Sequence, residues 1–296
     1  MLLADSGVAR AADCDAVCLA GLAATYMDGL SRRGSSAGLP WADRVRYAEN
    51  GVPMMVDDGI WATVTAHATA PLVIADPVTS NVVWMGEIEE HGQPAYLALR
   101  LAASGRRIAE AEEVIRRKEG RPPFADPQAF VVDARLTSPL PAGSRIPRAR
   151  IEALVKSYYT AAAGGRVVAL RFAADCARTE NGVTATGGDP GPAQTAAACA
   201  AQFRSGSFGD VENVRGLSVP VVDEARGLAV AVGTRDYSGR PTTPSTTNGR
   251  PLAADARYPH SYAFIAVFKL ERGSISRIQE VSSSVPYLMP TWKDQR

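Results

Sequence analysis

The chain repeats itself across a spacing of more than 130 residues, and this duplication limits the possible folds more than any other feature. Leu19, Leu22, Ala23, Tyr26 and Met27 recur as Ile151, Leu154, Val155, Tyr158 and Tyr159, at a constant offset of 132. The tetrapeptide Glu49-Asn50-Gly51-Val52 recurs as Glu180-Asn181-Gly182-Val183 at an offset of 131, so one residue has been lost between the two landmarks. A period this long exceeds a solenoid repeat and indicates duplication of a whole domain.

Each copy is predicted to begin with a helix and to continue as strands. Apolar residues recur at i, i+3, i+4 and i+7 over 14–33 and 148–163, which predicts two amphipathic helices. The repeated Asn-Gly predicts a tight turn in each copy. Strands are expected at 73–75, 82–89, 95–101 and 107–118 in the first copy, and at 219–222, 228–235, 262–270 and 274–284 in the second.

One of these strands is predicted only because of the repeat. Residues 107–118 have the composition of a charged helix, but their counterpart 274–284 is rich in Ser and β-branched residues and favours a strand. Glu113-Val114 aligns with Glu280-Val281 at an offset of 167. Both segments are therefore expected to be strands.

The predicted fold class is α+β, with two copies of a helix followed by an antiparallel meander. The first domain covers 14–119 and the second covers 148–292. Residues 120–147 contain six prolines and are expected to form a linker over the surface. Residues 238–259, rich in Thr, Pro and Gly, form an insertion in the second copy that is either a lid or a mobile loop.

Composition excludes several partners. The net charge is +1 and the basic residues are dispersed, so nucleic acid is not an expected partner. No apolar run approaches the roughly 18 residues of a membrane span. Met1-Leu2-Leu3 lacks a signal-peptide core, whereas Ala9-Arg10-Ala11 resembles the end of a cleavage site. The N-terminus is therefore either the tail of a cytoplasmic protein or the remnant of an export signal.

The four cysteines fall two in each copy: Cys14 and Cys18, then Cys176 and Cys199. Sequence alone allows three full pairings, and four buried thiols are a further alternative. We favour pairing within each copy, in a protein that is secreted or periplasmic. A zinc site is not expected, because there is no CxxC doublet and there are only three histidines.

A set of short motifs resembles a known fold family. These motifs include CDAVCL at 14–19, YAENG at 47–51, DGIW at 58–61, ADP at 75–77, ALRL at 98–101, CARTENG at 176–182, VDEARGL at 222–228, FKL at 268–270, VPY at 285–287 and Trp292. The chain resembles the nuclear transport factor 2-like, or SnoaL-like, cone fold, and in particular a two-domain family of mostly uncharacterised fungal and bacterial proteins, often secreted. The resemblance implies two tandem cones, each with helices packed on a curved antiparallel sheet. It implies no single reaction, because this fold hosts many functions.

In a cone of this kind, the helix covers a concave sheet and encloses an apolar pocket lined by aromatic residues. The candidate substrate-binding residues are Tyr47, Trp61, Trp84 and Met85 in the first copy and Tyr158 and Tyr159 in the second. The alternative is that these side chains only fill the cores. The first copy, with three of the four tryptophans, is expected to have the more aromatic pocket.

Few titratable residues are expected beside these apolar pockets, where burial would shift their pKa values toward neutrality and suit them to acid–base catalysis. His67 is expected on a helix or loop that covers the first pocket, and Asp236 and His260 are a candidate pair in the second copy. Tyr26 or Arg100, the latter aligned with Lys269, is a candidate for stabilising an oxyanion. Glu49 and Glu180 are repeated, which favours a structural role for both. Alternatively, His67 is a surface or capping residue and Arg100 pairs with a neighbouring glutamate at the sheet surface.

Two functions therefore remain open. The first is a cofactor-independent lyase, isomerase or dehydratase that acts by acid–base chemistry on a hydrophobic, aromatic or polyketide-like molecule. The second is a non-catalytic exported protein that binds a small apolar ligand or forms a homo-oligomer through a sheet face. No nucleotide-binding, nucleophile or metal motif occurs, so no cofactor or metal is expected. Convergent polar groups with shifted protonation favour the enzyme, and a core filled by its own side chains favours the binder.

Overall fold

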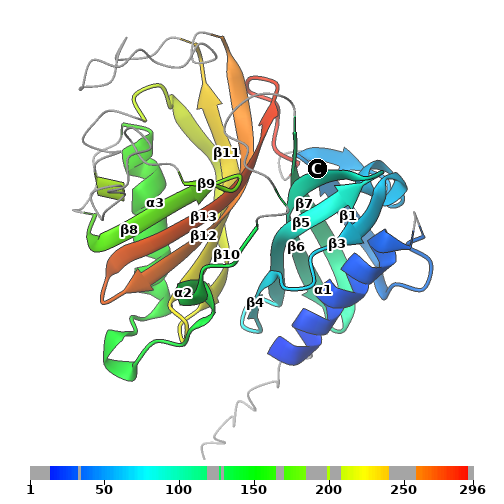
Figure 1. Cartoon of the computed structure of the whole chain (residues 1–296), viewed down its shortest axis with the longest axis horizontal. Coiled ribbons are helices and arrows are strands. Elements are labelled where there is room, and N and C mark those ends of the chain that lie inside the picture. Colours follow the sequence, from blue (N-terminus) through cyan, green and yellow to red (C-terminus); the bar gives the residue numbers. More distant parts are fainter. Residues whose placement is uncertain are drawn as a thin grey trace, which may run out of the picture.

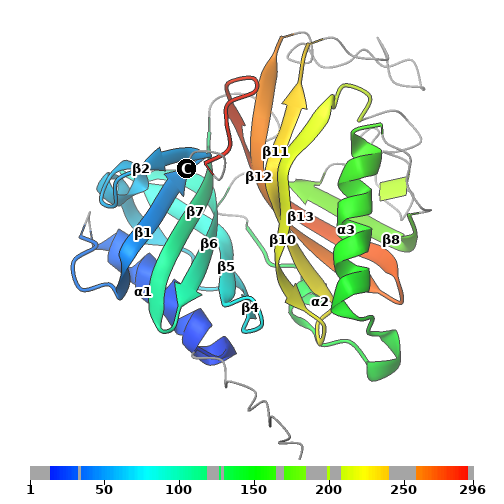
Figure 2. The ribbon, with the colours of Figure 1, turned by 180° about the vertical axis from the view of Figure 1, so that it is seen from behind.

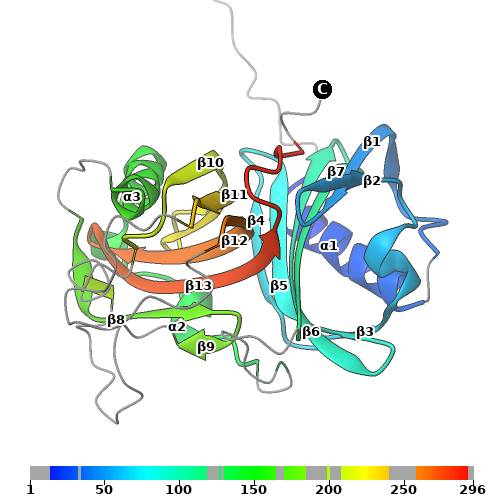
Figure 3. The same ribbon diagram turned by 90° about the horizontal axis from the view of Figure 1, so that it is seen from above.

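The two copies form two helix-on-sheet units that pack through their sheets. The computed structural model describes residues 14–32, 35–118, 127, 130–164, 170–184, 199–200, 208–239 and 258–292. Figure 1 and the reverse view in Figure 2 show the helix of each copy on an outer side and the two sheets between them. The order of layers is helix, sheet, sheet, helix, as the view from above also shows (Figure 3). The predicted α+β, two-domain architecture is confirmed at this level.

The helix of each copy buries one face on its own sheet. In the first copy, α1 spans Ala16–Ser31, and its N-terminus is capped by Asp15, whose carboxylate accepts from the backbone N–H of Cys18 at 2.8 Å. In the second copy, α3 spans Arg148–Ala162, directly after Pro147. The predicted apolar stripes, including Tyr26 in α1 and Tyr158 in α3, are buried as expected.

The first sheet is mixed rather than antiparallel. Its strands are β1 (Trp41–Glu49), β2 (Val52–Met54), β3 (Val64–His67), β4 (Leu72–Asp76), β5 (Asn81–Glu90), β6 (Gln93–Ser104) and β7 (Arg107–Arg117). Their order is β2-β1-β7-β6-β5-β3, with β4 also paired to β5. The first long strand, β1, runs parallel to the last strand, β7. The prediction of a purely antiparallel sheet was therefore wrong, because the sequence does not reveal that the two ends of the meander meet.

The second sheet has the same connectivity. Its strands are β8 (Phe172–Glu180), β9 (Val183–Thr184), β10 (Asn213–Asp223), β11 (Leu228–Tyr237), β12 (His260–Glu271) and β13 (Ser274–Val285). Their order is β10-β11-β12-β13-β8-β9, and β8 again runs parallel to the last strand. Residues 240–257, most of the predicted insertion, lie outside the described residues.

The repeated Asn-Gly turns connect β1 to β2 and β8 to β9. Asn50 and Asn181 have φ of 48° and 47°, and the glycines that follow have φ of 80° and 75°, as a tight hairpin turn with positive φ at both positions requires. Each asparagine side chain also accepts a hydrogen bond from the last strand, from Ile115 N and Ser282 N, both at 2.9 Å. The turn therefore secures the parallel pairing, which explains why this motif is present in both copies.

A third apolar cluster joins the two sheets. It contains Val83, Met85 and Ala98 from the first sheet and Val230 and Ile265 from the second, all of them buried. At one edge of this interface, the guanidinium of Arg148 donates to both carboxylate oxygens of Asp76, at 2.8 Å each. The interface is therefore an apolar core with an ion pair at its edge whose carboxylate is buried, rather than a loose contact between domains.

The segments outside the two sheets also contribute to this packing. The Pro-rich segment contains a short helix, α2 (Ala134–Thr137), and buries Leu136 and Leu140, so its described part is not simply a surface linker. At the C-terminal end, Trp292 lies against the first domain and its indole N–H donates to Glu112 at 2.7 Å. The C-terminal end of the second copy therefore contacts the first domain directly.

Candidate functional site

The interior of the first domain holds a buried carboxyl group between two phenols. Glu113 on β7 accepts hydrogen bonds from Tyr26 on α1 at 2.6 Å and from Tyr47 on β1 at 2.8 Å. Around it, Tyr26 packs edge-on against Trp61, with ring centroids 5.0 Å apart, and against Trp41 at 5.8 Å. Trp84 belongs to the same core. The aromatic side chains predicted to line a first pocket therefore fill the space between α1 and the sheet.

Burial changes the protonation of this group. Loss of solvation raises the pKa of Glu113 to about 8, so this carboxyl group is largely protonated at neutral pH. The protonated form can donate to the Tyr47 oxygen, because the Tyr47 hydroxyl also lies 3.4 Å from the carbonyl oxygen of Asp58 and can donate there. The phenols thus satisfy Glu113 in a closed network.

The interior of the second domain holds a different cluster, built from two carboxylates and two arginines. Glu180 on β8 and Glu280 on β13 are register partners in the parallel strand pair. Arg178 Nη2 lies 2.7 Å from Glu180 and 3.4 Å from Glu280, while Arg235 Nη2 lies 2.9 Å from Glu180 and 2.5 Å from Glu280. Each arginine therefore bridges both carboxylates, and the Ser282 hydroxyl donates a further bond to Glu180 at 2.7 Å.

The two carboxyl groups differ in protonation. Burial raises the pKa of Glu280 above its ordinary value, and the two arginines compensate only in part. Burial also acts to raise the pKa of Glu180, but Arg178, Arg235 and the Ser282 hydroxyl outweigh it and lower that pKa strongly. A pair of carboxyl groups shifted in opposite directions is the arrangement from which acid–base roles are assigned.

Part of this cluster lacks hydrogen-bond partners. Tyr159 Oη, Arg178 Nε and Arg235 Nε are buried, and none has a hydrogen-bond partner among the residues that the structure describes. Native proteins contain few such groups, and each costs about 1–3 kcal/mol when left unsatisfied. All three belong to side chains in the space between α3 and the sheet, where Tyr159 stacks on Phe264 at 4.7 Å and Arg235 lies over the same ring at 5.4 Å.

The duplication places the same pair of carboxyl groups in both domains. Glu49 and Glu113 are register partners, as are Glu180 and Glu280. The environments have diverged, however, because the position of Tyr47 is occupied in the second copy by Arg178, at the repeat offset of 131.

The neighbours across the sheet have diverged as well. In the first copy, the residues next to Glu113 on β6 and β5 are Leu99 and Trp84. In the second copy, the residues next to Glu280 on β12 and β11 are Ala266 and Ala231. The second interior therefore has smaller side chains beside its carboxyl group and a charged cluster in place of the phenols.

The prediction that His67 lies on a helix or loop covering the first pocket is wrong. It ends the edge strand β3, where its Nε2 lies 3.3 Å from the carboxylate of Asp28 and its ring packs edge-on against Trp84 at 6.2 Å. This places His67 outside the closed network of Glu113.

The predicted pair of Asp236 and His260 is not formed. Asp236 faces the sheet–sheet interface, where it accepts hydrogen bonds from Arg215 and from the Ser261 hydroxyl, both at 2.6 Å. His260 is the register partner of Tyr237, stacks on that ring at 4.8 Å, and lies 2.7 Å from the carbonyl oxygen of Tyr258 through Nδ1. Neighbouring residues of a strand point to opposite faces, which explains why the pair is separated.

Arg100 and Met85 also differ from the prediction. Met85 lies in the sheet–sheet cluster rather than under α1. Arg100 lies on the same face, buried between Glu112 at 2.8 Å and Glu110 at 2.6 Å. Arg100 also does not align with Lys269. Arg100 lies opposite Glu112 and Lys269 lies opposite Arg277, and these two partners are not related by the offset of 167 that aligns the last strands.

Tyr26, Tyr158 and Tyr159 do lie in the domain interiors as predicted. Sequence reasoning missed Arg178, Arg235 and Glu280, and treated Glu180 as structural. The available signal was the repetition of both glutamates, at offsets of 131 and 167, combined with the pairing of the strands that carry them.

All four cysteines form disulfides, Cys14 with Cys18 and Cys176 with Cys199, in the pairing favoured from the sequence. In the described part of the chain, no three His, Cys, Asp or Glu side chains are grouped so as to hold a metal ion. No helix among the described residues is long and apolar enough to cross a membrane.

The second copy of the chain matches a family model. Residues 144–282, which include the whole charged cluster, are similar to a family described as a domain of unknown function (DUF8021). No curated protein matches the chain. The match covers the second copy, in which the two carboxyl groups are bridged by arginines.

Proposed function

We propose that the second domain is the functional one, and that it is a cofactor-independent acid–base enzyme of the lyase, isomerase or dehydratase type. Its substrate would be a small hydrophobic molecule, aromatic or polyketide-like, that contains a carbonyl group. The observation that carries the proposal is the pair Glu180 and Glu280, two carboxyl groups of opposite pKa shift bridged by Arg178 and Arg235. A carboxyl group whose pKa is raised toward neutrality suits general acid–base catalysis.

In this proposal Glu280 transfers the proton. Its carboxylate removes a proton from the carbon next to the substrate carbonyl, and its acid form returns the proton to another atom of the substrate. The negative charge that develops on the carbonyl oxygen is stabilised by the Nε–H groups of Arg178 or Arg235 and by the Tyr159 hydroxyl, which have no hydrogen-bond partner among the described residues. Glu180 stays ionised and positions the two guanidinium groups.

The first domain is assigned a structural role. Glu113 is satisfied by Tyr26 and Tyr47, and Trp61 and Trp84 fill the space that a ligand would need. A core filled by its own side chains is what the binding-protein alternative predicted, and the first copy has such a core.

We further propose that each domain is a cone of the nuclear transport factor 2-like type, supported by a helix over one face of a sheet whose first and last long strands pair. We also propose that the protein works outside the reducing cytoplasm, in an oxidising compartment. The support for this is that all four cysteines are joined in disulfides.

The direct test is exchange of an α-proton for solvent deuterium in an enolisable benzo-fused ketone such as 2-tetralone, followed by NMR. The wild type is expected to accelerate exchange, and Glu280→Gln to lower that rate on the order of 100-fold. The matched control is Glu113→Gln, which changes the equivalent carboxyl group of the first domain and is expected to retain the wild-type rate. Equal exchange by wild type and Glu280→Gln would refute the assignment of Glu280.

A further inference from the structure

A second candidate site lies on the other face of the second sheet, away from the charged cluster. A groove of about 540 Å³ is formed between the short helix α2, the segment that follows it and the ends of β8 and β12. Its lining includes Ala134, Arg135, Pro139, Leu140, Asp175 and Lys269. This volume is in the range of sites that take a small organic molecule.

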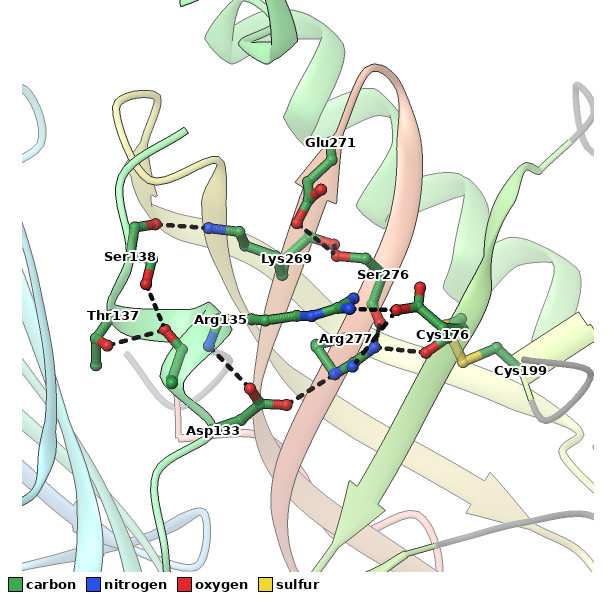
Figure 4. Close-up of polar contacts among 12 residues, drawn as sticks. Asp133, Arg135, Thr137, Ser138, Cys176, Cys199, Lys269, Glu271, Ser276 and Arg277 are labelled. Atoms are coloured by element: carbon green, nitrogen blue, oxygen red, sulfur yellow. Dashed lines mark hydrogen bonds and ion pairs between the residues drawn. A yellow bond between two sulfur atoms is a disulfide. The ribbon is translucent and has the colours of Figure 1, made fainter. Parts of the chain in front are cut away.

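Most charges around the groove are already paired (Figure 4). Arg135 forms an ion pair with Asp175, and Arg277 forms one with Asp133 at 2.7 Å. Glu271 accepts a hydrogen bond from the Ser276 hydroxyl at 3.3 Å. The two ion pairs hold the walls of the groove together and neutralise one another, whereas the hydrogen bond from Ser276 leaves the charge of Glu271 in place.

Lys269 is the exception. Its residue is only 1% exposed, yet among the described residues its ammonium group forms no ion pair and donates one hydrogen bond, to the backbone carbonyl of Ser138 at 2.9 Å. Figure 4 shows the side chain reaching from β12 toward this carbonyl. An ammonium group has three donors, so two of them are not accounted for by the described residues. A buried cation without an ion-pair partner is costly. Burial lowers the pKa of Lys269, although the charges of Glu271, Asp223 and Asp133 act in the opposite direction.

We propose that this groove binds a small organic carboxylate, whose negative group pairs with Lys269. The carboxylate would supply the missing negative charge and the two missing acceptors. Ala134, Pro139 and Leu140 provide an apolar wall for the rest of the molecule, which favours an organic anion over an inorganic one. The site is separate from Glu280, so it stands whether or not the second domain is an enzyme.

Isothermal titration with sodium benzoate tests this site, with sodium phosphate as the comparison anion. We expect saturable binding of benzoate to the wild type and at least about tenfold weaker binding to Lys269→Met, the loss of one buried charge-assisted contact. The charge-matched control is Lys156→Met, because Lys156 is exposed on α3 and its loss is expected to leave binding unchanged. Circular dichroism of Lys269→Met shows whether the variant is folded, and Lys269→Gln serves as the second variant.

Results of two kinds, on benzoate and on phosphate, would overturn the proposal. One is an absence of saturable benzoate binding by the wild type, or equal binding by folded Lys269→Met or Lys269→Gln. The other is binding of phosphate as tight as that of benzoate, which would contradict an organic carboxylate as the ligand.

Discussion

Glu180 and Glu280 lie directly opposite each other on adjacent parallel strands, and they are held together by two arginines that each contact both carboxyl groups. Two like charges in this position repel each other. The conflict is relieved because burial raises the pKa of Glu280 while the arginines lower that of Glu180. One member of the pair therefore keeps its proton more readily than the other.

This difference predicts unequal costs of substitution. Glu180→Gln removes the charge that compensates Arg178 and Arg235, and we expect it to lower the free energy of unfolding by on the order of 3 kcal/mol. Glu280→Gln replaces a carboxyl group that keeps its proton more readily. We expect this substitution to lower the free energy of unfolding clearly less than Glu180→Gln does. Urea unfolding of both variants at pH 7 measures the difference. A larger loss for Glu280→Gln than for Glu180→Gln would contradict the assigned protonation.

The raised pKa of Glu113 in the first domain predicts that the free energy of unfolding depends on pH. The pKa of Glu113 is raised from 4.5 to about 8 on folding, so the folded state binds this proton more tightly than the unfolded state. Its contribution is fully present below about pH 4.5 and is lost as the pH rises toward 8, with a slope of up to about 1.4 kcal/mol per pH unit. Glu113→Gln removes this slope.

The measurement is the free energy of unfolding of wild type and Glu113→Gln at several pH values from 5 to 8. We expect the free energy of unfolding of the wild type to fall steadily relative to that of Glu113→Gln as the pH rises. A constant difference across this range would show that Glu113 is ionised throughout.

The two disulfides should differ in their contribution to stability. The cysteines of the Cys176–Cys199 bridge are 23 residues apart in sequence and those of Cys14–Cys18 only 4. Loop-closure entropy gives about 3 kcal/mol for the longer loop and about 2 kcal/mol for the shorter one. Thermal unfolding of the two double Cys→Ser variants should therefore show the larger loss for Cys176/Cys199. The reverse order would mean that contacts other than chain entropy dominate.

The ion pair between Asp76 and Arg148 should couple the two domains. Asp76 is 1% exposed and also accepts from the backbone N–H of Val222 at 2.9 Å. We expect Asp76→Asn to lower the free energy of unfolding by about 2 kcal/mol. In calorimetry we expect a single unfolding transition for the wild type and a broadened or split one for Asp76→Asn. The control is Asp43→Asn, whose carboxylate is 94% exposed in its pair with Arg107 and should contribute little. Similar effects of the two substitutions would argue against this coupling.

The sequence predicted the parts of the fold that depend on local patterns. The repeat located both helices, and the strand-like counterpart 274–284 correctly assigned 107–118 as a strand despite its helical composition. The parallel pairing of β1 with β7 could not be predicted, because it joins segments separated by most of a domain and leaves no periodic signal.

The candidate site was harder to predict for the same reason. Asp236 and His260 are close in the strand register, but the alternation of a β-strand sends Asp236 to the interface and leaves Arg235 in the interior. Which face of β11 is interior depends on where α3 packs. Once that is known, Arg178, Arg235 and the repeated glutamates fall into one cluster.

Titration with p-nitrophenol tests the central claim most directly, because the bound phenolate stands in for the developing oxyanion and its absorbance reports the charge. We expect saturable binding that favours the phenolate form, weakened at least about tenfold in folded Arg235→Met and also reduced in Tyr159→Phe. Arg107→Met, which removes an exposed arginine of the first domain, should bind as the wild type does. The account is contradicted if the wild type gives no saturable change, or if Arg235→Met and Tyr159→Phe bind the phenolate as tightly as the wild type.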